Sequence, residues 1–574
     1  MDPSRLNASL DQAERLLNQG SLHDAEAIYR DVLDELPGQP IASQGLGLIA
    51  LHTGHASAAV ELLQMAAIGQ PDDAAIHTHL GLAFGAAGDQ ASSEACLRKA
   101  IDLAPSFADA HLNLANLLLE TGRINDAAQS YERAVELAPE SGPVYYGTAM
   151  LEMRRGDHSA AIEALETALR FAPALLPARV NLANLLLHTG QRTEAVAHLE
   201  EAVVIAPNNF DAQLNLCAAL QQTDRTSEAV GVARSALSLA PESPELLLNL
   251  SSAETADGHP EEAWRTLDRA LGVAPDYAPA KLNRAMVRLL LSDMPEAWED
   301  FEARPSRGAI PRPEIAALPE WQGQAAEGKT IVVWAEQGFG DVIQFIRFLP
   351  RLKEIGATVI FVATRPLKRI LTSVHGIDAF HDLDGNDTFP AADFHLPLLS
   401  IMHRFDISEK DIGAAEIYIV PPDPTSDLWQ PSGKRSVGLC WRGSPNNPND
   451  HRRSLQPDEL IERLQKLDIE LVGLQYGVDE IGIPNPGGRV ANFAELAGII
   501  AQLDLVLTVD TSVAHLAGAM GKPVWVMLPF APDWRWMTER SDSPWYPSMR
   551  LFRQDAPGDW ACVYSAVEDA ISQL

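Results

Sequence analysis

The sequence predicts an α-helical solenoid of repeats followed by two α/β domains with parallel sheets. The N-terminal half of the 574 residues repeats with a period of 34 residues, and a period of this length is typical of stacked helix pairs. From Lys329 onward the pattern changes to short apolar runs that alternate with amphipathic stretches, which indicates strands and helices in turn and therefore a parallel sheet. A chain of this length is also too long to fold around one core.

Three residue types mark the repeat at fixed phases. Prolines stand 34 residues apart at Pro37, Pro71, Pro105, Pro139, Pro173, Pro207, Pro241 and Pro275. Glycines share the period at Gly20, Gly54, Gly88, Gly122, Gly156, Gly190 and Gly258, with Asp224 in the missing place, and alanines follow it at Ala66, Ala100, Ala134, Ala168, Ala202, Ala236 and Ala270. The glycine ends the first helix at a position that tolerates positive φ, the alanine lets two helices approach, and the proline stops the second helix. The pattern resembles the tetratricopeptide repeat, and we assign residues 1–304 to eight full repeats and a partial ninth ending near Phe301.

A further phase of the repeat carries asparagine on the first helices, at Asn113, Asn181, Asn215, Asn249 and Asn283. His79 and Gly147 occupy the other two places. A carboxamide donates and accepts hydrogen bonds at once, so a ladder of them can bind the backbone of an extended acceptor peptide. The alternative is that these asparagines bond to the neighbouring helix and fix its register. The repeat arrays of O-linked N-acetylglucosamine transferases carry a similar ladder, and this resemblance implies acceptor binding.

The composition restricts the partners of the chain. The formal charge of −34 would repel nucleic acid and acidic membrane surfaces. No apolar run approaches 18 residues and the N-terminus lacks a secretory signal, so we expect no membrane span and a cytoplasmic protein. The four cysteines show no metal-ligand spacing, and we interpret them as reduced, buried thiols. Proteins and small molecules are the expected partners.

A proline-rich segment, Arg304 to Pro319, ends the periodic region, and we predict a linker at residues 305–328. The first α/β domain is predicted over residues 329–428 and the second over residues 429–574. In the first we expect strands at 330–334 and 358–363 and helices at 342–355 and 366–374; in the second we expect strands at 436–441, 470–474 and 503–509 and helices at 492–500 and 516–520.

A glycine-bearing turn follows the first predicted strand of the first domain. Gly338 and Gly340 would let the backbone approach a ligand. Asp341, at the head of the next helix, either caps that helix or faces the cleft as a general base. The residues alone leave both interpretations open.

The loop after the first strand of the second domain is rich in arginine. Arg442, Arg452 and Arg453 are candidates to hold a nucleotide phosphate, because guanidinium groups pair with phosphate oxygens through two hydrogen bonds. The alternative is a solvated loop with surface pairs to Asp450 and Glu459.

Two further strands of this domain deliver polar residues to the same edge of the sheet. Gln475 follows the strand at 470–474 and is placed to meet a nucleobase or ribose. Asp510, Thr511 and Ser512 follow the strand at 503–509, where they either cap the next helix or bind an anion with its free N–H groups. His515, one turn further on, either binds phosphate or is a satisfied structural histidine. The aromatic segment 529–547 either stacks on sugars and bases or wedges two domains together.

The turns at Asp341 and Asp510 resemble those of bacterial heptosyltransferases, which have the GT-B glycosyltransferase fold of two Rossmann-like halves. The resemblance implies that Asp341 is the base, with Glu336 in reserve. It also implies that Gly338, Gly340, Asp510, Thr511, Ser512 and His515 contact the donor. No DxD pair lies in the cleft-forming turns, which fits transfer without a metal ion, in which arginines and a helix dipole stabilise the leaving phosphate.

The pairing of such a module with tetratricopeptide repeats resembles the flagellin glycosyltransferases of alphaproteobacteria, which attach a nonulosonic acid such as pseudaminic acid. This resemblance implies a cytoplasmic protein O-glycosyltransferase that acts on Ser or Thr of a protein, with flagellin as the first candidate. It needs no cofactor beyond the nucleotide sugar, for which CMP-linked and ADP-linked forms are candidates. Two alternatives are a heptosyltransferase-like enzyme that acts on a glycolipid or polysaccharide, and a non-catalytic repeat scaffold.

Overall fold

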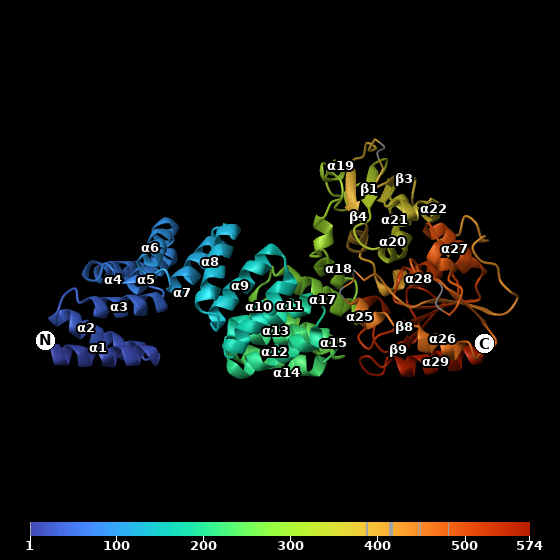
Figure 1. The fold of residues 1–574 in the computed structure, drawn as a ribbon. Helices are drawn as coiled ribbons and strands as arrows, with labels where there is room; N and C mark the ends of the chain where they lie inside the picture. The colour runs from blue at the N-terminus through green and yellow to red at the C-terminus, as the bar shows by residue number, and fades with distance from the viewer. Residues whose placement is uncertain are drawn as a thin grey trace. The chain divides into compact units, whose positions relative to one another are not determined.

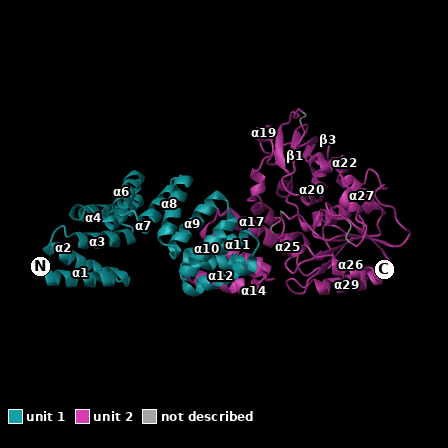
Figure 2. Ribbon diagram, in the orientation of Figure 1, with its two compact units in different colours: residues 1–219 teal, residues 220–574 magenta. Residues whose placement is uncertain are grey.

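The computed structural model describes residues 2–372, 374–385, 388–412, 417–445, 447, 449–479 and 482–574. The chain forms two compact units, residues 1–219 and 220–574, which Figure 2 shows in separate colours. Its fold is the one predicted, a helical repeat region followed by two parallel α/β sheets consistent with two Rossmann-like domains (Figure 1).

The first unit consists of repeat helices that pack as consecutive pairs. They are α1 (Pro3–Asn18), α2 (Leu22–Glu35), α3 (Pro40–His52), α4 (Ala56–Gly69), α5 (Ala74–Ala86), α6 (Gln90–Leu103), α7 (Ala108–Glu120), α8 (Ile124–Leu137), α9 (Gly142–Arg155), α10 (His158–Phe171), α11 (Leu176–His188), α12 (Arg192–Ile205) and α13 (Phe210–Gln222), whose last turn belongs to the second unit. The seven periodic alanines are buried, and the seven periodic glycines all have positive φ. The predicted mechanical roles of both residue types are confirmed.

The second unit begins with the remaining repeat helices, which are α14 (Thr226–Leu239), α15 (Pro244–Ala256), α16 (Pro260–Val273), α17 (Ala278–Leu290) and the short α18 (Glu296–Phe301). The last of them joins the core of the α/β region. The indole of Trp298 donates to the carbonyl of Ile407 at 2.7 Å and meets the ring of Trp534 edge-on at 5.8 Å. The end of the repeat array and the α/β domains therefore share one hydrophobic core.

The first α/β domain has a four-stranded parallel sheet in the order β3-β2-β1-β4. Its elements are β1 (Thr330–Trp334), α20 (Phe339–Phe345), η2 (Ile346–Phe348), α21 (Pro350–Glu354), β2 (Thr358–Ala363), η3 (Arg365–Leu367), α22 (Lys368–Leu371), β3 (Ala379–Asp382), β4 (Phe394–Pro397), η4 (Leu398–Ser400), α23 (Ile401–Arg404) and α24 (Glu409–Ile412). The predicted helix 342–355 is divided into α20, η2 and α21; Pro350 has no N–H to continue a helical ladder.

The segment that we predicted as a linker covers one face of this sheet. It contains η1 (Pro305–Gly308) and α19 (Pro313–Ala316). Alternate residues of β1 face opposite ways: Val332 and Trp334 pack with Ile315 of α19, whereas Ile331 and Val333 pack with α20 and α21. Both faces of the sheet are therefore covered, as a parallel sheet requires.

The second α/β domain has a five-stranded parallel sheet in the order β6-β5-β7-β8-β9. Its elements are β5 (Ser436–Cys440), α25 (Asp450–Arg453), α26 (Asp458–Leu464), β6 (Glu470–Gly473), η5 (Pro486–Arg489), α27 (Phe493–Gln502), β7 (Leu505–Val509), α28 (Ser512–Ala519), β8 (Val524–Leu528), η6 (Trp534–Trp536), β9 (Met549–Arg553) and α29 (Trp560–Ser572). Helices α26 and α29 cover one face, and α27 and α28 pack into the core on the other. Figure 1 shows this domain in orange and red.

None of the four cysteines, all of which the structure describes, forms a disulfide. Cys217 and Cys440 are buried, as expected, but Cys96 and Cys562 are only partly buried. The prediction of buried thiols was therefore wrong for these two, which lie near the exposed sides of α6 and α29.

Candidate active site

A cleft of about 1210 Å³ lies at the carboxyl ends of both parallel sheets. Eleven of the twelve catalytic and donor-binding residues predicted from the sequence line it: Glu336, Gly338, Gly340, Asp341, Arg442, Arg453, Gln475, Asp510, Thr511, Ser512 and His515. The twelfth, Arg452, is not among the lining residues.

The strand order explains why these residues meet. In the second sheet β6 lies on one side of β5 and β7 on the other, so the order in which the strands are added reverses between β5 and β7. In the first sheet β1 lies between β2 and β4 in the same way. Open α/β sheets bind ligands at the carboxyl ends of strands beside such a switch point. The three turns that carry the predicted site residues of the cleft follow β1, β5 and β7, apart from Gln475, which follows β6.

Asp341 lies in the first turn of α20 and pairs with Arg535 across the cleft. The carboxylate accepts a hydrogen bond from Nη2 of Arg535, and its side chain is 18% exposed. Burial raises the pKa of the Asp341 carboxyl above its usual range, and the positive charge of Arg535 opposes this shift. The N-cap of α20 is Gly338, so Asp341 is not the capping residue. A carboxylate in a cleft with a raised pKa is suited to accept a proton.

Arg535 is the main site residue that the sequence did not predict. It comes from η6 and its side chain is 10% exposed. Its Nη1 donates to Asp533 at 2.8 Å, its Nε donates to Gln344 at 2.7 Å, and its guanidinium lies 4.3 Å from the centre of the Trp534 ring. Helix α17 packs against η6, so the last repeat supports the element that carries Arg535.

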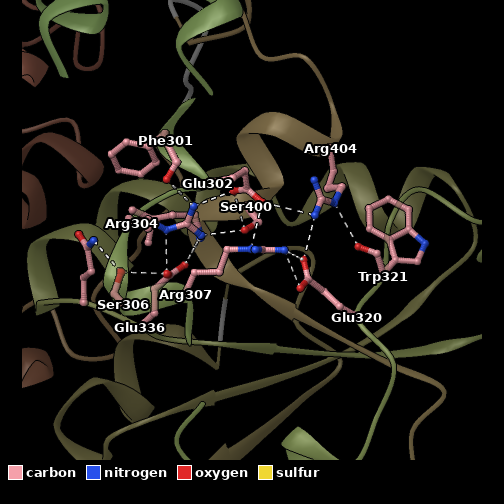
Figure 3. A network of polar contacts seen from close by, with 12 residues as sticks. Phe301, Glu302, Arg304, Ser306, Arg307, Glu320, Trp321, Glu336, Ser400 and Arg404 are labelled. Carbon is pink, nitrogen blue, oxygen red and sulfur yellow. Dashed lines mark hydrogen bonds and ion pairs between the residues drawn. The ribbon is translucent and has the colours of Figure 1, made fainter. Parts of the chain in front are cut away.

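Glu336 is among the residues around the cleft, but its carboxylate is enclosed in a buried polar network (Figure 3). Its oxygens accept from Nε and Nη2 of Arg304 at 2.8 and 2.9 Å. They also accept from the hydroxyl of Ser306 at 3.1 Å and from the N–H of Leu399 at 3.0 Å. The side chains of Glu336 and Arg304 are 0% and 1% exposed. Four hydrogen-bond donors occupy the carboxylate oxygens, and this position favours a structural role over that of a base.

The network joins the end of the repeat array to the turn after β1. Glu302, in the C-cap position of α18, accepts from Arg304 at 2.7 Å and from Ser400 at 2.8 Å. Arg404 reaches Glu320 at 2.9 Å, and Figure 3 shows these side chains converging on one another. The turn after β1 is therefore held through Glu336 by Arg304 and Ser306, which follow α18, and by the N–H of Leu399 in η4.

The turn after β7 combines a helix cap with an open cleft position. Helix α28 begins at Ser512, four residues earlier than the predicted helix, because Thr511 is its N-cap and accepts from the N–H of Val513 at 3.3 Å. Thr511 and Ser512 also line the cleft. Capping is therefore confirmed for Thr511. The N-terminus of α28, with the positive end of its dipole, also opens on the cleft, and anion binding there stays a prediction.

Asp510 lies beside this helix and is buried. Burial, together with the negative charge of Asp533, raises the pKa of its carboxyl to about 6, although Arg453 and Arg535 lower it. Nη1 of Arg453 is 4.0 Å from its carboxylate. The site therefore places three carboxylates, those of Asp341, Asp510 and Asp533, close to the guanidinium groups of Arg453 and Arg535.

His515 is buried and uncharged at neutral pH. Burial and the charges of Arg535, Arg347 and Arg453 hold the pKa of its imidazole well below the usual range. Its Nδ1 lies 3.0 Å from the hydroxyl of Tyr546, and its ring stacks on Trp536 at 5.5 Å. A Cβ atom on Gly340 would lie 2.9 Å from the His515 ring. Gly340 thus lets α20 approach α28, a role that the sequence did not predict, and the predicted approach of a ligand to this glycine stays a prediction.

The two adjacent arginines of the loop after β5 point to different partners. Arg453 lines the cleft, and Gly443 makes room for it because a Cβ there would lie 2.7 Å from its Nη2. Arg452 instead pairs with Asp224 at 2.9 Å and donates to the carbonyl of Gln221. Successive residues of α25 lie about 100° apart around the helix, so the two side chains diverge. The assignment of Arg452 to the donor phosphate does not agree with this geometry.

Gln475 lines the cleft, and its side chain supports the same loop. Its side-chain oxygen accepts from the N–H of Arg442 at 2.9 Å and its nitrogen donates to the carbonyl of Arg442 at 3.1 Å. It therefore fixes the backbone that carries Arg442. The next residue, Tyr476, lines the cleft and is 72% exposed, and its ring is free to stack on a planar group. Asn446 and Pro448 of the predicted loop lie outside the described residues.

The five ladder asparagines are partly buried on the first helices of their pairs, α7, α11, α13, α15 and α17. Three of them donate within the repeats: Asn113 to the carbonyl of Asp109, Asn181 to the hydroxyl of Tyr146 and Asn283 to the hydroxyl of Ser252. The last two contacts cross to the preceding first helix. A Cβ on Gly147 would lie 2.5 Å from the Tyr131 ring, which accounts for the glycine at that place.

In the described part of the chain, no group of three or more His, Cys, Asp or Glu side chains could hold a metal ion. No helix among these residues is long and apolar enough to cross a membrane.

Comparison with known families bears on the repeats. The Tetratricopeptide repeat family matches residues 9–81, 79–142 and 152–220. The N-terminal helix pairs are tetratricopeptide repeats. Such repeats stack into surfaces that bind other proteins. The chain thus joins a tetratricopeptide repeat region to a C-terminal α/β region.

The chain is similar to a relative of known sequence and to two repeat proteins of known structure. Protein FlbA of Caulobacter vibrioides is 28% identical over 330 residues, which cover 49% of this chain and 53% of that protein. The chain therefore spans about half the length of this relative. YrrB, a repeat protein with an unusual peptide-binding site, matches 32% of this chain and 95% of its own at 24% identity and a TM-score of 0.30. PilF of Pseudomonas aeruginosa matches 38% of this chain and 99% of its own chain at 18% identity and a TM-score of 0.34. These scores carry no functional argument.

Proposed function

We propose that this protein is a metal-independent glycosyltransferase that transfers a sugar from a nucleotide donor to a Ser or Thr hydroxyl of a protein. The observation that carries the proposal is the single cleft at the carboxyl ends of both sheets, which brings Asp341 together with Arg453, Arg535 and the N-terminus of α28. Its volume of about 1210 Å³ is ample for a nucleotide sugar and an acceptor side chain, since ligand pockets commonly span about 300–1,000 Å³.

Each group has a role in this reaction. Asp341 accepts the proton of the acceptor hydroxyl, which then attacks the anomeric carbon of the donor sugar. Arg453, Arg442 and the N-terminus of α28 neutralise the charge that develops on the leaving phosphate. Neutral His515 offers a hydrogen bond to the same group, and Tyr476 is the candidate to stack on the nucleobase.

The acceptor is proposed from the repeats and the relative. Tetratricopeptide arrays bind extended protein segments, and the distant relationship to Protein FlbA of Caulobacter vibrioides supports flagellin as the first acceptor to test. A nonulosonic acid such as pseudaminic acid, carried on CMP, is the first donor to test, and ADP-linked sugars are the second.

The test is incubation of the full chain with flagellin and each nucleotide sugar, followed by intact-mass measurement of flagellin. We expect an added mass equal to one or more sugar residues with one donor. An unchanged mass with every donor would contradict the proposal. Sugar transfer to lipid acceptors but not to flagellin would instead support the glycolipid alternative.

The adjacent arginines of α25, Arg452 and Arg453, allow a matched pair of substitutions that tests the donor site. We expect Arg453→Gln to weaken binding of the donor nucleotide by about 10-fold or more, because a charge-assisted hydrogen bond to phosphate is lost. Arg452→Gln, which removes the same charge one residue away, should change binding by less than about twofold. Isothermal titration of both variants measures the difference. Equal weakening by the two would show that only the net charge of the loop matters.

The asparagine ladder provides a test of the acceptor surface. Replacing Asn181, Asn215 and Asn249 together by Ala should weaken flagellin binding while nucleotide binding is kept, because only the repeats change. Thermal unfolding of the variant is the control, since Asn181 also bonds to Tyr146 in the preceding pair. Weakened binding of both ligands would indicate that the repeats had been destabilised and not that an acceptor contact had been lost.

A further inference from the structure

The guanidinium of Arg535 is shared among groups that belong to both halves of the cleft. From the first domain, Asp341 and Gln344 accept its Nη2 and Nε hydrogens. From its own segment, Asp533 accepts an Nη1 hydrogen at 2.8 Å. Trp534 covers one face of the guanidinium at 4.3 Å. Arg535 is thus held in place by Asp533 and Trp534 of its own segment. One of its partners in the first domain, Asp341, is the proposed base.

This pairing blocks the base in the absence of ligand. A carboxylate that accepts a charge-assisted hydrogen bond from a guanidinium is stabilised as an anion and is a weaker proton acceptor. Asp341 and Arg535 both line the cleft, so an acceptor hydroxyl that approaches Asp341 must compete with Arg535 for the carboxylate. A free and basic Asp341 therefore requires another anion to take its place on Arg535.

The position of Arg535 indicates that the anion that replaces Asp341 is a phosphate of the donor. The residue lines the same cleft as Thr511 and Ser512 at the N-terminus of α28. The neighbouring Trp536 stacks on His515 of that helix at 5.5 Å, which ties η6 to the phosphate turn. A leaving phosphate bound at this turn lies next to a guanidinium whose planar fork matches its oxygens.

We propose that Arg535 exchanges partners during the reaction: it pairs with Asp341 in the free protein and with a phosphate of the donor nucleotide once the donor binds. This inference rests on the proposed function of the cleft. Donor binding then releases Asp341, so the base becomes available only when a sugar is ready for transfer. Donor must therefore bind before acceptor for transfer to occur.

The transfer step balances with these groups. The hydroxyl O–H bond of the acceptor breaks and its proton goes to the Asp341 carboxylate. The hydroxyl oxygen forms the new bond to the anomeric carbon. The bond from that carbon to the leaving phosphate breaks, and its electron pair stays on the phosphate oxygen, where Arg535 meets the new charge.

A double-mutant cycle on nucleotide binding tests the exchange. CMP, ADP, UDP and GDP are titrated calorimetrically into the full chain, and the tightest binder is carried through the cycle. Asp341→Asn should tighten its binding about 10-fold, because the nucleotide no longer competes with a carboxylate for Arg535. Arg535→Gln should weaken binding, and Asp341→Asn should then give no gain in the Arg535→Gln background.

The outcomes separate the inference from the function on which it rests. An equal gain from Asp341→Asn in both backgrounds would mean that Asp341 only repels the nucleotide through its charge, and no gain in the unsubstituted background would also overturn the exchange. Failure of all four nucleotides to bind would contradict the proposed function itself.

A second measurement keeps the test decisive if Arg535→Gln does not fold. Separation from Arg535 makes the Asp341 carboxyl hold its proton more strongly, so nucleotide binding to the unsubstituted protein should take up protons. Titrations in buffers of different ionisation enthalpy, from about pH 5 to about pH 8, measure this uptake. Asp341→Asn should remove part of it, and an unchanged uptake in that variant would overturn the exchange.

Discussion

Replacing Asp341 by asparagine is expected to lower the rate of sugar transfer by about 100-fold to 10,000-fold, the range that general-base groups contribute. Asparagine has nearly the same shape as aspartate but cannot accept the hydroxyl proton at neutral pH. The readout is the initial rate of mass gain on flagellin at saturating donor.

The expected result is specific because the same substitution should leave donor binding intact or tighter. Loss of transfer together with loss of nucleotide binding would mean that Asp341 positions the donor. Transfer at the full rate would contradict the assignment of Asp341 as the base. Asp533→Asn is the matched control, since Asp533 also pairs with Arg535 at 2.8 Å but comes from the donor side of the cleft, and it should retain most of the transfer rate.

The second large effect is expected on stability, from the buried pair of Arg304 and Glu336 (Figure 3). Glu336→Ala should lower the free energy of unfolding by about 3–5 kcal/mol, because it leaves the Arg304 guanidinium buried without its main partner. Denaturant unfolding followed by tryptophan fluorescence measures the change. Glu320→Ala is the control from the same network, and its partly exposed carboxylate should make the loss smaller.

This prediction also decides between the two interpretations of Glu336. A structural Glu336 predicts that Glu336→Gln lowers stability while the folded fraction still transfers sugar at a rate close to that of the unsubstituted protein. A Glu336 that serves as the base predicts the opposite, a stable protein with little transfer.

The fold could be predicted because its signals are local and periodic. The spacing of proline, glycine and alanine gives the helix pairs, and the runs 330–334 and 358–363 become β1 and β2 with the predicted bounds. The helix after the first strand was predicted as one continuous helix, since a continuous apolar pattern conceals the interruption before Pro350. The prolines of the segment 305–328 are typical of a linker. Its apolar residues, however, pack on the first parallel sheet, whose strands come from later parts of the chain.

The site could be predicted where a strand, a turn and a helix follow one another in the chain. Asp341 and Thr511 stand at such junctions, and parallel sheets bring the junctions together. Arg535 lies in an aromatic segment without a repeating pattern, and only the three-dimensional structure places it against Asp341, 194 residues earlier.

The sequence contains an indication of the contact that Arg452 makes. Asp224 interrupts the glycine period, and it takes a positive φ of 58°, which is unfavourable for a residue with a side chain. The structure shows that this aspartate pairs with Arg452. A break in an otherwise regular repeat thus marked a contact with the α/β region, and it distinguishes Arg452 from Arg453.

The most direct test of the site is a crystal structure of the full chain soaked with CMP, ADP, UDP or GDP. We expect the phosphate to lie at the N-terminus of α28, bonded to Arg453 and Arg535, with the Asp341 carboxylate separated from Arg535 and open to the cleft. A nucleotide bound away from α28 would contradict the donor site. A nucleotide bound at α28 while Arg535 still pairs with Asp341 would contradict the exchange.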